Sequence, residues 1–201
     1  MSDSHDKVIK NVVILVAMEA EANPMIKHLG LTEKTDQFPP KAPSKCFSGT
    51  YKESTVHVVT NGKCRRFGVD NIGTDSATLS TWLALEARTE TNDPRFTRLH
   101  SGSIFRTLSP DLMINAGTAG GFMKHGTSIG DVFLSSKVCN HDRRIPIPGF
   151  NEFGIGNHVA VPTPGLQEAL SCQAGVVTTG NSFDHTEMDD KMMDGNGERD
   201  G

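Results

Sequence analysis

The first strong hydrophobic pattern in the chain is an unbroken apolar run from Val12 to Ala17. Most of its residues are β-branched, and a short continuous run of this kind is typical of a strand covered on both faces of a parallel sheet. The residues Met18–Ala22 are rich in helix formers, and the helix is expected to extend towards Gly30, since glycine commonly ends a helix. The pattern therefore predicts a buried strand followed directly by a helix.

Apolar runs and a helix-length segment continue to alternate as far as about residue 180. Further short strands are expected over residues 47–49, 56–60, 111–116, 131–136 and 175–180. A helix is expected over Val69–Ala87, where apolar residues lie at helical spacing. This alternation predicts an α/β fold.

Three stretches interrupt the pattern. Residues 33–46, which contain three prolines, are expected to form a loop. Residues 88–109 are polar and arginine-rich, and we expect a loop or insertion that is partly disordered. Residues 186–201 are polar and rich in aspartate and glycine, so we expect a disordered tail. Because no repeat or linker divides the chain, a single domain is expected over residues 1–201.

Composition and charge narrow the classes of function. The 201 residues suit one α/β domain, and a net charge of −4 without a long Lys/Arg run argues against a nucleic-acid partner. The polar, acidic residues 1–6 are unlike a signal peptide, and a six-residue apolar run cannot cross a bilayer. The four cysteines form no Cys-x-x-Cys pair, so we expect reduced thiols, no zinc site and a cytoplasmic protein without a membrane partner.

Two carboxylates follow the first predicted strand. Glu19 and Glu21 lie just beyond its carboxyl end, which is the edge where open α/β sheets bind their ligands. A carboxylate at that edge can act as a general base on water. The alternative is that one or both are solvated residues of the first helical turn, where the helix dipole favours negative charge.

A glycine-rich segment, Asn115–Gly121, accompanies the strand expected at 111–116. Its glycines allow the backbone to come close to a ligand, and the Thr118 hydroxyl can bond to a sugar oxygen or to water. The glycine spacing fits neither of the common nucleotide-phosphate motifs. The alternative is a tight turn after the strand without ligand contact.

Two later segments also carry candidate residues. Phe183, in the segment Thr179–Asp184 after the last predicted strand, either stacks on a heterocyclic base or lies in the core beside a turn. The segment His141–Pro148 combines charged residues with two prolines, and it forms either a partner surface or a solvated loop.

Five segments together resemble the 5′-methylthioadenosine/S-adenosylhomocysteine nucleosidases. One of them, His141–Pro148, is similar to the plant-type branch of that family. The five segments occur in the family's order over about residues 11–185 and are Ala17–Glu21, Asn115–Gly121, Ile129–Val132, His141–Pro148 and Thr179–Asp184. The resemblance implies a nucleoside-phosphorylase-like three-layer α/β sandwich with a mixed central sheet. It also implies a homodimer that needs no metal or cofactor.

The activity implied by the resemblance is hydrolysis of the N-glycosidic bond of 5′-methylthioadenosine, in methionine salvage. The products are adenine and methylthioribose, and some members of the family also cleave S-adenosylhomocysteine. Glu21 matches the carboxylate that activates the attacking water, whereas Glu19 matches a neighbour of the base.

The resemblance also implies which residues bind the substrate and which form the dimer. Residues beside the ribose and the water correspond to Thr118, Ala119 and Gly120. Ser182 and Phe183 match the backbone that faces adenine and the side chain that packs on it. The segment near the dimer interface corresponds to Ile145, Pro146, Ile147 and Pro148.

The sequence departs from the family after Asp184. The family continues with a Met-Glu pair, whose glutamate holds the ribose hydroxyls, and with an aspartate that protonates adenine, but residues 185–201 match neither. We therefore expect the C-terminal elements of the fold to be missing and the chain to be inactive and poorly stable.

Two other functions stay open. One is a catalytically inactive fragment that binds nucleosides or takes part in a dimer. The other is a purine or uridine phosphorylase of the same fold, which would need arginines around a phosphate; Arg65 and Arg66 do not match such a site convincingly.

Overall fold

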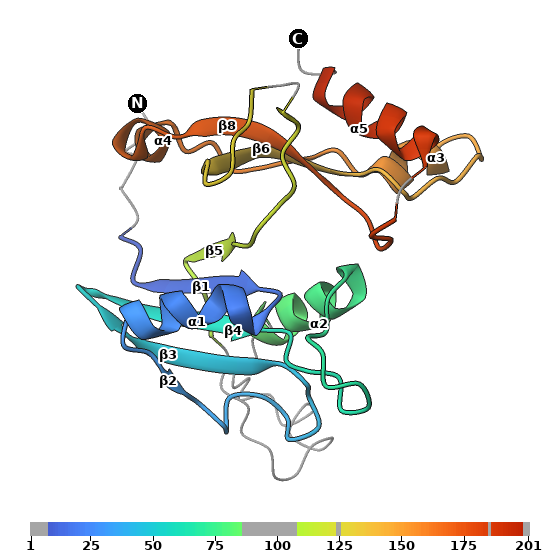
Figure 1. Cartoon of the computed structure of the whole chain (residues 1–201). Coiled ribbons are helices and arrows are strands. Elements are labelled where there is room, and N and C mark those ends of the chain that lie inside the picture. Colours follow the sequence, from blue (N-terminus) through green and yellow to red (C-terminus); the bar gives the residue numbers. More distant parts are fainter. Residues whose placement is uncertain (1–7, 86–107, 124–125, 185, 199–201) are drawn as a thin grey trace, which may run out of the picture. The chain divides into compact units, whose positions relative to one another are not determined.

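The computed structural model describes residues 8–85, 108–123, 126–184 and 186–198 (Figure 1). Contacts between residues divide the chain into two compact units, residues 1–119 and residues 120–201, and each unit has its own sheet. The expected single domain over residues 1–201 stays a prediction.

The first unit is built on a mixed five-stranded sheet. In sheet order its strands are β2 (Thr32–Glu33), β3 (Lys45–Tyr51), β4 (Ser54–Thr60), β1 (Asn11–Val16) and β5 (Leu112–Asn115). β1 lies between two parallel partners, β4 and β5, while β2 pairs antiparallel with β3, and β3 with β4. β1 is therefore the central parallel strand that its continuous apolar run predicts.

One helix packs on each face of this sheet. The two helices are α1 (Glu19–His28) and α2 (Thr74–Leu85). Val13 of β1 belongs to a core cluster with Leu83 of α2, whereas Val16 belongs to a second cluster with Ala22 of α1. Side chains three positions apart on a strand point to opposite faces, so the two clusters lie on the two sides of the sheet. This helix–sheet–helix order, with its mixed sheet, confirms the expected sandwich.

The second unit contains a mixed three-stranded sheet. Its order is β7 (His158–Val159), β6 (Phe133–Asn140) and β8 (Gln173–Thr179). β6 pairs antiparallel with β7 and parallel with β8, and the β6–β8 register shifts between Ser135 and Lys137. The described helices of this unit are α3 (Phe150–Ile155), α4 (Pro164–Leu170) and α5 (Glu187–Glu198).

Every predicted strand is present, but the structure corrects other boundaries. α2 begins at Thr74 rather than at Val69, because Lys63 and Asp70 form an isolated bridge that closes a loop before it. The sequence pattern predicts none of α3, β7 and α4, which are short. Of the loop or insertion expected over residues 88–109, residues 88–107 lie outside the described part of the chain.

The structure also corrects the disordered tail expected over residues 186–201. Residues 187–198 form helix α5. The Asp189 carboxylate accepts the backbone N–H and the hydroxyl of Thr186, both at 2.8 Å, and pairs with the Arg144 guanidinium. A helix start capped in this way and tied to a distant arginine is ordered by contacts that composition alone does not reveal.

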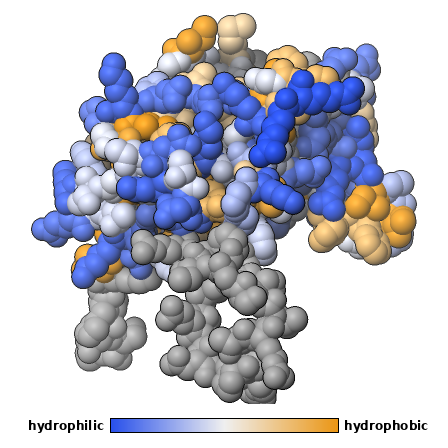
Figure 2. Space-filling model, turned by 90° about the horizontal axis from the view of Figure 1, so that it is seen from below, coloured by the Kyte–Doolittle hydropathy of each residue, from blue (hydrophilic) through white to orange (hydrophobic). Residues whose placement is uncertain are grey.

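The four cysteines, Cys46, Cys64, Cys139 and Cys172, are free thiols in the structure. Among the helices of the described ranges, none has both the length and the apolar character needed to cross a membrane. Figure 2 shows one face of the molecule, on which hydrophilic side chains predominate and hydrophobic ones form only small groups.

Candidate active site

The carboxyl ends of β1 and β5 bring two candidate segments of the first unit together. Because the two strands are parallel neighbours, they end at the same edge of the sheet, and the Ala116 N–H donates to the Leu15 carbonyl at 2.9 Å. Beyond this edge the chain continues from β1 to Glu21 and from β5 to Thr118. It is the edge at which open α/β sheets bind ligands.

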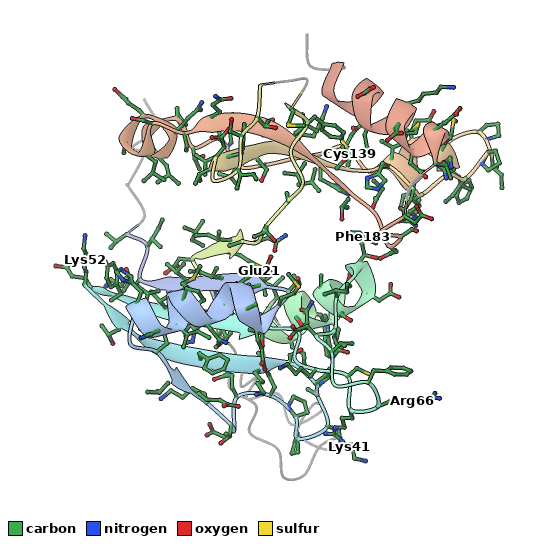
Figure 3. The ribbon with its side chains drawn as sticks, viewed as in Figure 1. Glu21, Lys41, Lys52, Arg66, Cys139 and Phe183 are labelled. Carbon is green, nitrogen blue, oxygen red and sulfur yellow. The ribbon has the colours of Figure 1, made fainter. Side chains whose placement is uncertain are left out.

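Glu21 is held in place by three hydrogen-bond donors (Figure 3 labels Glu21). Thr118 donates its backbone N–H to Glu21 Oε1 at 2.8 Å and its hydroxyl to the same oxygen at 2.6 Å. The Met18 N–H faces the other oxygen, Oε2, at 3.4 Å. Glu21 and Thr118 are thus in direct contact, because the strands that they follow are neighbours in the sheet.

Glu19 has different surroundings. Lys63 Nζ lies 2.7 Å from Glu19 Oε2, and Lys45 Nζ lies 3.6 Å from Oε1. The hydrogen bond from Lys63, with the charges of both lysines, lowers the pKa of the Glu19 carboxyl. A carboxylate engaged in two ion pairs is a poor proton acceptor, so the geometry favours Glu21 over Glu19 as a general base.

The glycine-rich segment after β5 is open to solvent. Thr118, Ala119 and Gly120 are exposed, and a side chain at Gly120 would meet no atom within 4 Å. A Cβ at Gly117 would come within 3.5 Å of the Glu21 carboxylate, so the backbone runs close beside that group. The segment is accessible to a ligand, and ligand contact stays a prediction.

A cavity lies at the same edge of the sheet. Its volume is about 120 Å³, and its lining residues are Leu15, Val16, Ala17, Asn61, Ala77, Thr81 and Asn115. Binding sites for drug-sized ligands commonly measure ~300–1,000 Å³. This cavity therefore has room for only part of a nucleoside.

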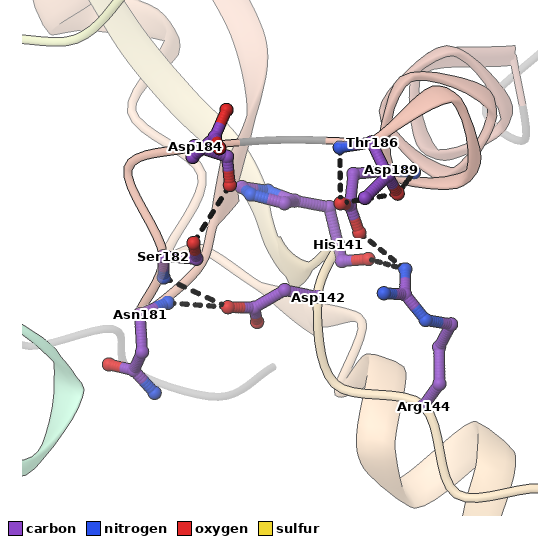
Figure 4. Close-up of polar contacts among 8 residues, drawn as sticks. All are labelled: His141, Asp142, Arg144, Asn181, Ser182, Asp184, Thr186 and Asp189. Atoms are coloured by element: carbon purple, nitrogen blue, oxygen red, sulfur yellow. Dashed lines mark hydrogen bonds and ion pairs between the residues drawn. The ribbon is translucent and has the colours of Figure 1, made fainter.

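In the second unit, Ser182 and Phe183 lie in the loop that follows β8. The Phe183 side chain is fully exposed, so the alternative of a buried core residue is wrong (Figure 3). Asp142 Oδ2 accepts the N–H of Asn181 at 2.6 Å and that of Ser182 at 3.3 Å, and the Ser182 hydroxyl donates to the Asp184 carbonyl at 2.8 Å (Figure 4). An exposed aromatic ring on a fixed loop is suited to stacking on a flat ligand.

The segment Ile145–Pro148 presents apolar side chains to solvent. Ile147 is 54% exposed, and a shallow cavity of about 290 Å³ is lined by Pro148, Gly149, Phe150 and Phe153. The Arg143 guanidinium lies 4.9 Å from the centre of the Phe153 ring. This surface is of the kind that meets a partner, and the homodimer stays a prediction.

Reasoning from the sequence missed the charged residues that fix the candidate segments. Lys45 and Lys63 bind Glu19, Asp142 holds the loop after β8, and Asp189 holds α5. Their partners lie far along the chain, so spacing gives no signal for them. Asp142 alone had a signal, because it belongs to the charged stretch within His141–Pro148.

Known proteins are similar to this chain over most of its length. Residues 11–187 match the model of the phosphorylase superfamily. A 5′-methylthioadenosine nucleosidase of Arabidopsis thaliana is 38% identical over 186 residues, which cover 92% of this chain and 62% of that protein. A 5′-methylthioadenosine/S-adenosylhomocysteine nucleosidase of the same plant is 35% identical over 197 residues, which cover 98% of this chain and 70% of that protein.

Solved structures give the same result. A crystal structure of an MTA/SAH nucleosidase matches with a TM-score of 0.82 and 35% identity, over 95% of this chain and 70% of that one. The chain thus spans 62–70% of the length of these relatives. The resemblance seen in the sequence motifs is confirmed over most of the chain. The chain belongs to the phosphorylase superfamily and, within it, to the 5′-methylthioadenosine/S-adenosylhomocysteine nucleosidase family.

Proposed function

We propose that the protein hydrolyses the N-glycosidic bond of 5′-methylthioadenosine and releases adenine and methylthioribose. The observation that carries this proposal is the contact of Glu21 with Thr118, which orients a carboxylate at the ligand-binding edge of the sheet. Both Arabidopsis relatives are named as nucleosidases of this substrate. S-Adenosylhomocysteine is the second candidate substrate, because the name of one relative includes it.

In this reaction Glu21 acts as the general base. It takes a proton from water, the water oxygen bonds to C1′ of the ribose, and the bond from C1′ to N9 breaks with its electron pair passing to adenine. The transition state resembles an oxocarbenium ion, whose positive charge a nearby carboxylate stabilises. Thr118 engages Oε1 with two short hydrogen bonds, so we assign the proton transfer to Oε2.

Adenine leaves readily only when its N7 is protonated. Acid catalysis of this kind contributes ~10²–10⁴-fold. The family resemblance gives the role to an aspartate that none of the matching segments contains, and we assign it to no residue of this chain. A measurement of turnover therefore tests whether the chain can protonate the leaving adenine, whereas a measurement of binding tests substrate recognition.

Four other residues are proposed to bind the substrate. Phe183 stacks on the adenine ring and the Ser182 backbone faces it, while Ala119 and Gly120 lie along the ribose. The support is local: Phe183 is fully exposed on a hydrogen-bonded loop, and Ala119 and Gly120 are exposed beside Thr118.

A phosphorylase is less well supported than a hydrolase, because the two lysines that lie beside Glu19 are already engaged. Lys63 and Lys45 are both paired with the Glu19 carboxylate. A phosphate site requires cations that are available to the anion.

We also propose that the enzyme is a cytoplasmic homodimer that serves methionine salvage. The exposed apolar segment Ile145–Pro148 supports the dimer, and the four free thiols suit a reducing compartment. The pathway follows from the substrate, since cleavage of 5′-methylthioadenosine frees the methylthioribose unit.

The activity can be tested by incubating the chain with 5′-methylthioadenosine and separating the products. Any turnover should yield adenine and methylthioribose in equal amounts, at a rate independent of phosphate. Because no acid is assigned to the leaving group, we expect the rate of this chain to be low. Phosphate-dependent release with formation of a sugar 1-phosphate would show a phosphorylase instead. Binding in a calorimeter without turnover would support the inactive nucleoside-binding alternative, and absence of both contradicts the proposed function.

A further inference from the structure

The loop after β8, residues 180–184, carries the side chain proposed to stack on adenine, yet no core side chain anchors it. Residues 181–184 are all exposed, so packing contributes little to the shape of the loop. We infer that Asp142 is a positioning residue for recognition of the purine base, because its carboxylate fixes this loop. The inference rests on the proposed function, in which Ser182 and Phe183 meet the base.

Two hydrogen bonds to one carboxylate oxygen hold the loop. Asp142 Oδ2 accepts the Asn181 N–H at 2.6 Å and the Ser182 N–H at 3.3 Å (Figure 4). Hydrogen bonds to an ionised acceptor are about twice as strong as those between neutral groups. They lock two successive peptide groups immediately before Phe183, and so set the direction in which the chain carries the ring.

The carboxylate is itself placed by close packing against Gly180. A Cβ at Gly180 would lie 2.6 Å from His141 Nε2 and 2.8 Å from Asp142 Cγ, so a side chain there would displace His141 and Asp142. The His141 N–H donates to the Thr179 carbonyl at 3.0 Å, which extends the β6–β8 pairing to the dipeptide His141–Asp142. The sheet therefore positions Asp142, and Asp142 positions the loop.

Arg144 and Thr186 bind Asp189 in the first turn of α5, and Arg144 also donates to the His141 carbonyl at 3.2 Å (Figure 4). The Asp142 carboxylate bonds instead to Asn181 and Ser182. The Ser182 hydroxyl closes the other side of the loop on the Asp184 carbonyl at 2.8 Å. Asp142 is thus a side chain that links the sheet to the loop ahead of Phe183.

The test compares Asp142→Ala, Asp142→Asn and the control Glu152→Gln, which neutralises an exposed carboxylate on α3. Affinity for adenine and for 5′-methylthioadenosine is measured by calorimetry, and amide exchange of Asn181 and Ser182 is measured without ligand. We expect Asp142→Ala to weaken adenine binding about tenfold or more and to speed exchange of both amides. The asparagine amide oxygen still accepts hydrogen bonds, so Asp142→Asn should recover part of both effects.

Where turnover is measurable, Asp142→Ala should raise KM more than it lowers kcat, since its effect is on base binding. The control should match the wild type in every measurement. If Asp142→Ala binds both ligands as tightly as the wild type, this inference is overturned and the proposed function stands. The same holds if amide exchange of Asn181 and Ser182 is unchanged in both Asp142 variants. A wild-type chain that binds neither ligand overturns the proposed function and this inference with it.

Discussion

At the scale of single residues, the two carboxylates at the start of α1 differ in their partners. Glu21 accepts two hydrogen bonds from Thr118, which are donors without charge, whereas Glu19 is paired with Lys63 and Lys45. The Thr118 donors both engage Oε1 and so orient the Glu21 carboxylate, while Oε2 faces the Met18 N–H at 3.4 Å. Paired lysines stabilise the charged form and oppose proton uptake.

This difference predicts how the two residues respond to the same substitution. Glu21→Gln should lower the rate of adenine release by at least about 10²-fold while nucleoside binding is largely kept, because only the proton acceptor is lost. Glu19→Gln removes ion pairs that are partly exposed to solvent, and should change the rate less than about tenfold. Product assays and calorimetry on both variants provide the check. If Glu19→Gln is the inactive variant, the assignment of the base is wrong.

Gly120 gives a second prediction at this scale. Because a side chain there would meet no atom within 4 Å, Gly120→Val should keep the circular dichroism spectrum of the wild type. It should nevertheless weaken nucleoside binding tenfold or more, since the backbone must come close to the ligand. Gly165→Val on α4 is a matched control, because the space around Gly165 is equally open. Equal dissociation constants for both variants and the wild type would make the Gly120 segment merely structural.

From the sequence, candidate site residues could be located only where they follow a strand that an apolar run makes recognisable. Glu21 and Thr118 come into contact because β1 and β5 are parallel neighbours, and each strand is recognisable from its apolar run. Lys63 and Asp142, by contrast, contact residues that are far from them in the sequence, and loops bring these residues together. The path of a loop depends on local turns and bridges, and an apolar pattern says nothing about it.

At the scale of elements, the same limit separates predicted from missed structure. β1 and α1 were predictable because one apolar run and one helix-forming stretch follow each other, with Gly30 in the left-handed region at φ +62° after the helix. α5 was missed because its sequence, GluMetAspAspLysMetMetAspGlyAsnGlyGlu, contains two glycines and few apolar residues. Its order depends on Arg144, which lies 45 residues away from Asp189.

The Asp189 anchor predicts that α5 is sensitive to acid. The N–H and hydroxyl of Thr186 and the Arg144 guanidinium hold the pKa of the Asp189 carboxyl well below its ordinary value of 3.8. A lowered pKa in the folded state means that this stabilisation is complete above the ordinary value and is lost as the pH falls below it. Amide exchange in α5 should therefore accelerate, beyond its intrinsic pH dependence, between about pH 5 and about pH 2.5.

Two variants check the cause of this acid sensitivity. Asp189→Asn should show fast exchange in α5 already at neutral pH, because the charged acceptor is gone. Glu187→Gln, which neutralises an exposed carboxylate in the same helical turn, should behave as the wild type. Equal protection of α5 in all three proteins at neutral pH would mean that Asp189 does not anchor the helix.

At the scale of the whole molecule, the proposed homodimer gives the clearest prediction. Ile147 and Val161 are both exposed apolar residues of the second unit, at 54% and 77%, but only Ile147 belongs to the segment assigned to the interface. Sedimentation velocity should show a dimer for the wild type and for Val161→Asp, and mostly monomer for Ile147→Asp, since burial of an unpaired charge is costly. A monomeric wild type, or a dimeric Ile147→Asp, contradicts the proposed interface.

The central position of β1 has a consequence for synthesis of the chain on the ribosome. Val12 pairs with Val56 on one side and with Leu112 on the other, so its second partner emerges 100 residues (112 − 12) after it. At translation rates of ~5–20 residues per second, one hydrogen-bonding edge of this apolar strand waits about 5–20 s for its partner. An open apolar edge is a template for pairing with other chains. We therefore expect the nascent N-terminal segment to be the part of this chain most exposed to aggregation during synthesis.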